Sequence, residues 1–352
     1  MSSIDWNAAE LEIDYRYVVV DFRNREEKGE ITDITGGTIS RQYLSSLKEG
    51  ASLSWQNTYQ LADIGNDYIR IYLIASDGEN TVQEALGTFM VSTPTQQVSA
   101  LGISGSATCY SILQTLEDEK VPGSYQVGKN VNIINKCVSL LEERGLSVTP
   151  TLSDTTLSEP LVFDYQSSML DVLNGLLDAA GYDSAALDAY GNIILKPYEP
   201  PAGRPPYIVY DDDSTVAFLE STHEFDTFAI PNRVNIICSS AERVISGYAE
   251  NTDPDSQWSI PSRGRTISRN IEVQNLTSSA QANARAKREL SELTAVESFD
   301  VTHLYDGTFL GMQIGLRIGD LSVDGSITTQ EIALDEGCTV KDHARVFVKV
   351  GA

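Results

Sequence analysis

The segment GEITDITGGTISRQYLSSLKEGASLSW, residues 29–55, distinguishes a β-structure from a nucleotide-binding fold in the N-terminal part of the chain. Its glycine pair stands beside Ser and Thr, and such a pair can either cradle a phosphate or bend the chain. A phosphate loop leads into the N-terminus of a helix. Gly36 and Gly37 lead instead to a polar turn and to an alternating stretch that includes Leu53 and Trp55. We therefore predict a bend or bulge between two β-strands.

Strand patterns extend on both sides of this segment, over residues 11–92. The run YIRIYLIA at 68–75 alternates with the period of two of a β-strand. One face then carries Ile69, Ile71 and Leu73, and the other carries Tyr68, Arg70 and Tyr72. In GTFMVSTPT at 87–95, the proline is expected to end pairing inside a sheet. Turn-forming segments separate the strands, so residues 1–98 are predicted to form a small antiparallel barrel or sandwich.

Two helices are predicted in the following segment. In NVNIINKCVSLLEERG, residues 130–145, apolar residues recur at spacings of three, four and three, and Asn130 is the expected N-cap. In SSMLDVLNGLLDAAG, residues 167–181, the same pattern follows Ser167 or Ser168 as the cap. Each helix is short and marginal alone, so its apolar stripe must pack on a neighbouring element.

The remaining segments return to strands. DSAALDAYGNIILKPY at 183–198 is predicted to be a hairpin, and the proline-rich EPPAGRPPY at 199–207 a stiff connector. One long helix is predicted at 277–296, with the stripe Ala282, Ala286, Leu290 and Leu293.

We therefore predict a first β-barrel domain at 1–98, an α+β middle module at 99–200 and a second β-barrel domain at 201–352, with some strands shared between domains. The fold class is mainly β with an α+β insertion, built on two similar small antiparallel β-barrels.

The charge balance restricts the function. The chain of 352 residues carries 25 Lys and Arg against 50 Asp and Glu, a formal net charge of −25. Such a field repels nucleic acid, so sequence-specific binding of DNA or RNA is not expected. The sequence contains no run of about 18 apolar residues, so no membrane-spanning helix is predicted. The acidic N-terminus lacks the pattern of a secretory signal peptide, so we expect synthesis in the cytoplasm without export.

Four cysteines stand far apart in the sequence, at Cys109, Cys137, Cys238 and Cys338. A structural zinc site needs ligands paired at short spacing, and no CxxC is present. We predict four free thiols, most of them buried.

Other motifs give no specific chemistry. GSYQVGKN at 123–130 fits the start of a phosphate loop, but Asn130 stands where Ser or Thr would reach magnesium. A turn into a capped helix explains it. The three histidines, His223, His303 and His343, stand alone in the sequence and are predicted to serve packing or surface roles.

YDDDS at 210–214 offers three carboxylates, but successive strand residues point to opposite faces. A solvated turn is the preferred interpretation, and a weak calcium site is the alternative. We predict no catalytic residue, no metal ligand and no bound cofactor, and hence no enzyme.

The ordered set of segments resembles the central hub, or tail-tip, proteins of tailed bacteriophages and of related contractile injection machines. The resemblance lies in VVVDFRNREEKGEITDITGGTISRQYLSSLKEGASLSW (18–55), in the helix–strand–helix–hairpin run at 130–198 with its AAGY and YGNI, and in FAIPNRVNII (228–237). SIPSRGRTISRNIEVQ (259–274) and LRIGDLSVDG (316–325) continue it. No single motif is specific, and no catalytic residue is carried over from the family.

This resemblance implies a structural protein of the virion tail. Two barrels from each of three chains would form a pseudo-sixfold ring between the hexameric tail tube and a distal spike or fibre. The ring would line the path of the DNA, and acidic side chains in its lumen would keep phosphates from sticking. The expected partners are two further copies of the chain and other tail proteins.

Two alternatives come from other functional classes. A tail-associated cell-wall hydrolase would need converged carboxylates or a histidine dyad in a cleft. A host-glycan binding tail protein would expose aromatic side chains on one face, and Trp55, Tyr68 and Tyr72 are the candidates.

Overall fold

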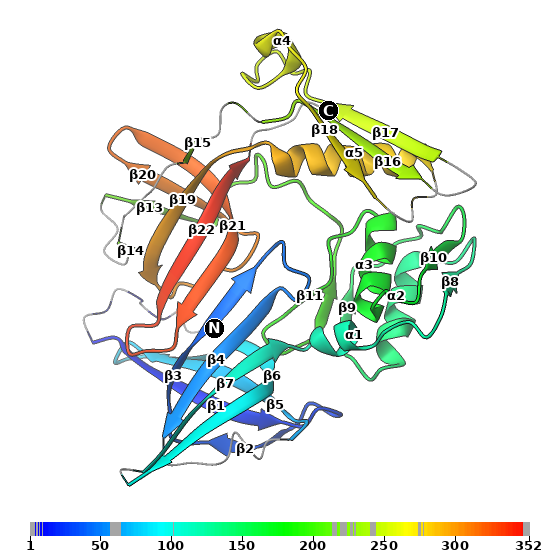
Figure 1. Ribbon diagram of the computed structural model, residues 1–352. Helices are drawn as coiled ribbons and strands as arrows, with labels where there is room; N and C mark the ends of the chain where they lie inside the picture. The colour runs from blue at the N-terminus through cyan, green and yellow to red at the C-terminus, as the bar shows by residue number, and fades with distance from the viewer. Residues whose placement is uncertain are drawn as a thin grey trace.

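The computed structural model describes residues 4, 6, 8, 10–56, 65–100, 102–212, 217–218, 224–225, 228, 230–239, 244–273, 276 and 278–347. Figure 1 shows two β-rich modules, one below and one at the upper left. A helix-containing module lies at the right, and a three-stranded sheet with a long helix lies at the top. Residues 57–64, between two strands of the lower module, lie outside the described part.

The first β-module is an antiparallel sheet in the order β3-β4-β7-β6-β5-β1-β2. Its strands are β1 (Glu12–Val20), β2 (Glu27–Ile31), β3 (Ile34–Gln42), β4 (Glu49–Gln56), β5 (Tyr68–Ser76), β6 (Thr81–Ser99) and β7 (Gly102–Ser111).

The glycine pair of β3 forms the predicted bulge. The β3–β4 register shifts between Ile34 and Gly36, and Gly36 has a φ of +143°. A Cβ on Gly37 would lie 2.1 Å from the carbonyl oxygen of Ser52, so the two backbones meet where only glycine fits. The pair is therefore a structural device in a strand, as predicted.

Strand β5 separates two cores, which is why its alternation matters. Ile69, Ile71 and Leu73 pack into the core of the first β-module together with Trp55 and Phe89. Tyr68 and Tyr72, on the other face, pack into the core of the middle module. The face that the sequence marks as half polar is thus covered by a neighbouring module, and β5 is buried on both sides.

Beyond the proline at position 94, the described pairs of β6 are with β7 alone, so this part of the strand is not central in the sheet, as the sequence predicts. β6 nevertheless continues to Ser99, and it pairs with β7 from Phe89 to Ser99, with a register irregularity between Ser92 and Thr95. Proline lacks an N–H to donate, and a bulge is one of the places where a strand tolerates it.

The middle module contains three helices, α1 (Gln114–Asp118), α2 (Ile133–Glu142) and α3 (Met169–Ala179). Its short strands are β8 (Tyr125–Val127), β9 (Val148–Pro150), β10 (Leu161–Phe163), β11 (Ala186–Leu187) and β12 (Ile193–Leu195). Strands β11 and β12 form the predicted hairpin, and β12 pairs in parallel with β9.

The caps of α2 and α3 test the helix predictions. Ser168 caps α3 in a capping box with Asp171, as one of the two predicted alternatives. The cap of α2 is Asn132, whose side chain accepts from the backbone N–H of Asn135; the prediction of Asn130 is wrong. Asn130 instead has a φ of +62°, a left-handed turn that asparagine tolerates.

The second β-module comprises β13 (Ile208–Asp211), β14 (Ala217–Phe218), β15 (Glu224–Phe225), β19 (Ala295–Leu304), β20 (Gln313–Ile318), β21 (Leu321–Ala333) and β22 (Thr339–Phe347). β13 pairs in parallel with β20, and the other pairs are antiparallel. β21 also pairs with β3 of the first β-module, from Thr329–Gln42 to Ala333–Thr38. The two β-modules therefore share one continuous sheet.

A separate sheet of β17 (Val244–Glu250), β16 (Arg233–Ser239) and β18 (Ser268–Glu272) packs on α5 (Ser279–Leu293), with the short α4 (Ile260–Arg263) beside it. Ser278 caps α5. The predicted stripe is confirmed, since Ala282, Ala286 and Leu290 are fully buried against Val234 and Ile236 and Leu293 packs on the same core.

The predicted fold class, mainly β with an α+β insertion, is confirmed. The prediction did not include the single sheet that runs through both β-modules. Among the described residues, each β-module is an open part of this shared sheet. The domain boundaries after residues 98 and 200 stay a prediction. β7, which follows the first of them, pairs with β4 and β6.

Candidate functional site

A buried polar network lies at the junction of the two β-modules, and His303 of β19 is at its centre. The imidazole is fully buried. Its Nε2 lies 3.1 Å from Oδ2 of Asp342 on the neighbouring strand β22. Its Nδ1 lies 2.7 Å from the Leu304 carbonyl oxygen and 3.2 Å from Oδ2 of Asp306. One histidine therefore stands between two carboxylates.

Neighbouring side chains fix the two carboxylates. The hydroxyl of Tyr210 donates to Oδ2 of Asp306 over 2.5 Å, and the Tyr210 ring lies 5.0 Å from the His303 ring. Gln330 of β21 donates through Nε2 to Oδ1 of Asp342 over 2.9 Å. Four strands, β13, β19, β21 and β22, thus contribute to one hydrogen-bonded cluster.

The network continues into the first β-module through Arg41 of β3. Its Nη1 donates to Oε1 of Gln330 over 2.6 Å, and Nη2 donates to the Leu86 carbonyl. Its guanidinium stacks over Phe309 at 4.1 Å, and its Nε lies 3.6 Å from Oε2 of Glu49. Arg41 is therefore a buried link between the two β-modules.

The electrostatics favour a buried imidazolium. Burial by itself would lower the pKa of His303, but the hydrogen bonds and charges of Asp306 and Asp342 outweigh it and raise the pKa to about 10. Burial would raise the pKa of Asp306, yet hydrogen bonds from His303 and Tyr210 hold it below its usual value. Burial raises the pKa of Glu49 to about 7 despite the opposing charge of Arg41.

This arrangement favours a structural role for the buried network over a catalytic one. Both ring nitrogens of His303 face acceptors, so the imidazolium has no free nitrogen to take a proton from a substrate. The side chain is also closed off from solvent. Within the described ranges, no group of three or more His, Cys, Asp or Glu side chains is placed to hold a metal ion.

The network predicts a specific pH dependence of stability. The pKa of His303 is about 10 in the folded chain against 6.5 for the free side chain, so its contribution is complete below about 6.5 and is lost as the pH rises through about 10. Lys48 acts in the opposite direction, since burial lowers its pKa from 10.5 to about 8. We therefore expect the difference in unfolding free energy between the wild type and His303→Leu to shrink from pH 6.5 to 10, measured by urea unfolding. A constant difference would contradict the buried imidazolium.

A second charged cluster joins α5 to the middle module. Arg285 pairs with Asp178 at the end of α3 and, over 2.6 Å, with Glu289. Arg288 lies 3.6 Å from Asp183, and its Nη1 donates over 2.9 Å to the Tyr182 carbonyl. These contacts tie the helix to the middle module, so the charges have partners within the chain.

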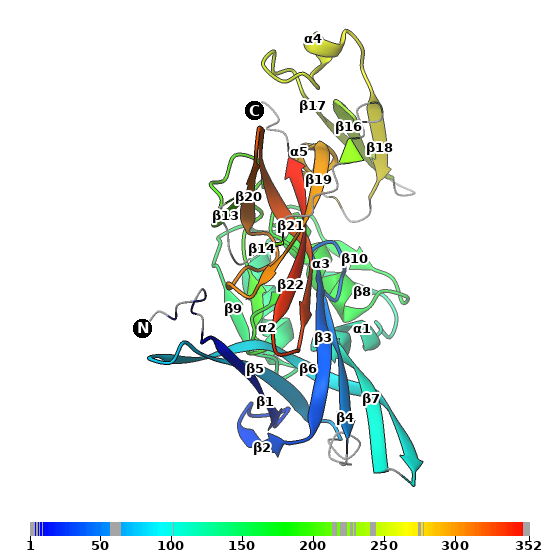
Figure 2. The same ribbon diagram turned by 90° about the vertical axis from the view of Figure 1, so that its left-hand side faces the viewer.

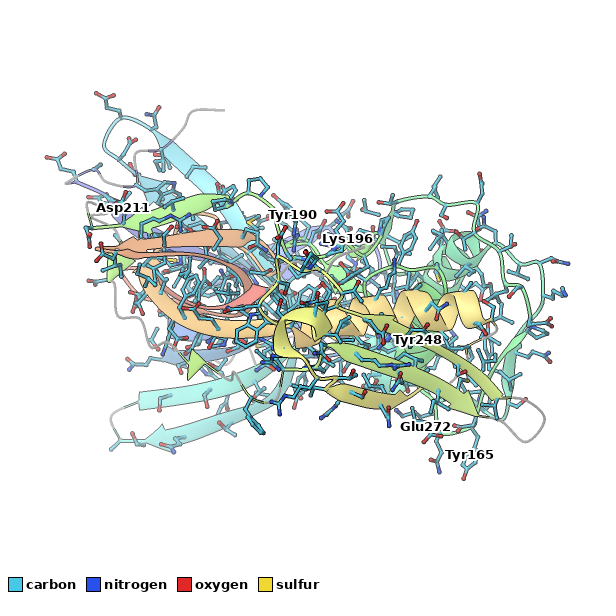
Figure 3. The ribbon with its side chains drawn as sticks, turned by 90° about the horizontal axis from the view of Figure 1, so that it is seen from above. Tyr165, Tyr190, Lys196, Asp211, Tyr248 and Glu272 are labelled. Carbon is cyan, nitrogen blue, oxygen red and sulfur yellow. The ribbon has the colours of Figure 1, made fainter. Side chains whose placement is uncertain are left out.

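A pocket of about 600 Å³ lies between the first β-module, the β11–β12 hairpin and the connector at 199–207. Lys48, Lys196, Tyr207 and Met312 are among its lining residues; Figure 3 shows Lys196 near the centre of the molecule as seen from above. The Lys48 ammonium donates to the Tyr43 carbonyl. The lysine is thus held by the backbone of its own turn.

The structure places the predicted candidates as follows. His303 is buried in the second β-module, where β19, β22 and the turn after β19 bring two carboxylates to it that the sequence analysis did not connect with it. His343 pairs with Asp300 at 2.9 Å on the half-exposed face of β22. His223 lies outside the described residues. The HLYD spacing at 303–306 is the one sequence signal that could have indicated the cluster.

The acidic run at 210–214, the GKN motif and the cysteines do not come together in one site. Of YDDDS, Tyr210 is buried, Asp211 is exposed and Asp212 accepts from the Gly319 N–H, while residues 213–214 lie outside the described part. The GKN motif follows β8 and forms a turn into α2. Of the four free thiols, Cys109, Cys137 and Cys338 are buried, and Cys238 is half-buried.

The aromatic side chains considered for glycan binding are core residues. Trp55, Tyr68 and Tyr72 are 1%, 4% and 5% exposed. They cannot stack on a sugar in this conformation, so the specific basis of that alternative is lost. None of the described helices is long and apolar enough to cross a lipid bilayer.

No protein-family model matches the chain, and no curated protein matches it in sequence. Solved structures do. The tail protein from Neisseria meningitidis MC58 has a TM-score of 0.67 at 12% identity, with 95% of this chain and 97% of that chain covered. The 43 kDa tail protein of prophage MuSo2 from Shewanella oneidensis has a TM-score of 0.63 at 12% identity, with 95% and 98% covered.

An injection-system protein gives a similar result. The E. coli c3393 protein, a component of the type VI secretion system that is structurally similar to T4 bacteriophage tail proteins gp27 and gp5, has a TM-score of 0.53 at 10% identity. The match covers 91% of this chain and 76% of that chain. The resemblance seen in the sequence is confirmed in three dimensions: the chain has the fold of phage tail proteins and of a type VI secretion system component that is structurally similar to phage tail proteins.

Proposed function

We propose that the chain is a structural component of a phage or prophage tail, and that three copies form a pseudo-sixfold hub ring between the tail tube and the distal tip. The observation that carries this proposal is the extent of the fold match. It runs over 95% of this chain and 97% of a bacterial tail protein, so it involves both β-modules and the middle module together.

The connections between the β-modules support a ring in which the two modules keep a fixed orientation. β21 pairs with β3, the Tyr15 hydroxyl donates to the Asp335 carbonyl over 2.8 Å, and the Tyr305 hydroxyl donates to Glu84 over 3.1 Å. Together with the buried network, these contacts hold the two β-modules in one orientation. A ring that alternates the two modules needs this fixed geometry, because a flexible hinge would let the annulus open.

The acidic composition supports passage of DNA through such a ring. With a net charge of −25, carboxylates facing a lumen would repel phosphates within a Debye length of about 10 Å. DNA would then slide without sticking. A ring with a neutral or basic bore would contradict this part of the proposal.

The alternative function, a cell-wall hydrolase, has a direct test. A hydrolase requires an accessible acid–base pair, whereas His303 is enclosed and fully hydrogen-bonded. We expect the purified chain to produce no clearing zone on a gel that contains cell-wall peptidoglycan, beside a lysozyme control that does. Clearing by this chain alone would contradict a purely structural role.

A further inference from the structure

The β6–β7 ribbon, residues 94–106, differs in composition from the rest of this acidic chain. It belongs to residues 85–116, which contain no Asp, Glu, Lys or Arg and form the longest uncharged stretch of the sequence. Within it, residues 94–100 are exposed, and Val98 is 72% exposed. A surface hairpin in a chain with 21% charged residues would ordinarily carry several of them.

The ribbon extends well beyond β5 along its β6 edge, and two residues beyond the last described β4 pair along its β7 edge. The β5 ladder along β6 ends at the Tyr68–Met90 pair, and the β4 ladder along β7 ends at the Gln56–Ser104 pair. Beyond these points the described pairs are those of β6 with β7, up to Ser99–Gly102. Figure 2 shows this end of β7 reaching past the strands beside it. A two-stranded hairpin is marginally stable in water, so packing against another surface would stabilise it.

Exposed strands without charge are a liability that proteins usually limit with Lys, Glu or Pro. Here the one such residue is the proline at 94, and the tip presents Gln96, Gln97 and Val98. The adjoining outer face of β7 and β4 carries small hydroxyl residues, namely Ser104, Ser106, Thr108, Ser52 and Ser54, all exposed. The described part of this surface is therefore exposed and uncharged.

We infer that the β6–β7 ribbon docks on a second copy of this chain and is the contact through which copies assemble. Two chains that each carry a net charge of −25 repel one another over most of their surfaces. An uncharged surface is where they can meet without placing like charges together. A basic partner would instead be attracted to the acidic surfaces. The inference rests on the proposed assembly of the chain and names the surface that makes it.

The test introduces charge into the ribbon. The Gln97→Glu/Val98→Glu variant is compared with Leu152→Glu/Val162→Glu, a control with the same added charge at exposed middle-module positions (70% and 50%). Light scattering after size-exclusion chromatography gives the mass over a range of concentrations. We expect the ribbon variant to need at least about tenfold more protein for assembly, because the added carboxylates place like charges against each other in the contact. The control should assemble as the wild type does, and both variants should keep the wild-type melting temperature.

A second measurement locates the contact without changing charge. A photo-crosslinking amino acid at position 97 should link to a peptide of another copy, identified with isotope-labelled and unlabelled chains mixed before illumination. Links confined to the same chain would overturn the inference. Rings formed equally well by the ribbon variant would overturn it and leave the proposed ring intact. A wild type that stays monomeric at every concentration and yields no inter-copy link would contradict both.

Discussion

His303→Leu is expected to lower the unfolding free energy by about 3–5 kcal/mol. The substitution removes the cation from between Asp306 and Asp342 and leaves two buried carboxylates without their charged partner. It also removes the ring that packs on Tyr210. The loss falls on β19 and β22, so we expect the second β-module to be the part most affected. Urea unfolding at neutral pH measures the change.

His343→Leu is the matched control. His343 has a carboxylate partner at 2.9 Å, Asp300, but both side chains are more than a third exposed. The expected change is about 0–1 kcal/mol. Adding Asp306→Asn and Asp342→Asn to His303→Leu should recover part of the lost stability, because it removes the unpaired charges. Equal effects of the two histidine substitutions would show that the buried network contributes little.

Gly37→Ala is expected to destabilise the chain by about 1–3 kcal/mol or more, since its methyl group would overlap backbone. The Cβ would lie 2.1 Å from the Ser52 carbonyl oxygen and 3.0 Å from a methyl carbon of Leu53. The Gly37 carbonyl also accepts from the Leu334 N–H over 2.9 Å, a bond between the two β-modules. A shift of β3 away from β4 therefore disturbs the junction with β21 as well.

Gly29→Ala serves as the control for this prediction. Gly29 lies in β2, and a Cβ there would meet nothing within 4 Å. We expect a change within about 0.5 kcal/mol, typical of a surface site. Thermal melts of the two variants give the comparison. A melting temperature of Gly37→Ala equal to that of Gly29→Ala would mean that β3 and β4 separate freely, against the proposed rigid junction.

Local sequence patterns predicted much of the fold, because bulges, helix caps and apolar stripes depend on residues that are close together in the chain. The bulge at Gly36, the cap at Ser168 and the stripe of α5 depend on short-range geometry, and all three are found. Asn130 failed as a cap because two asparagines stand two residues apart, and only the backbone conformation decides between them.

Long-range arrangement could not be predicted in the same way. The alternation in the sequence of β5 predicted which residues share each face of the strand. It did not predict that the middle module covers the face with Tyr68 and Tyr72. The pairing of β21 with β3 joins residues almost 300 positions apart, and no local signal marks it. The same holds for His303, because Asp342 reaches it only through the register of β19 and β22.

The most direct test of the proposed hub is an electron-microscopy reconstruction of the purified chain, assembled alone or with the tail-tube protein that adjoins it. We predict a closed ring of three copies in which the first and second β-modules alternate around an acidic bore as wide as the tube channel. Single copies without a ring, or a ring in which one β-module lies outside the annulus, would contradict the account.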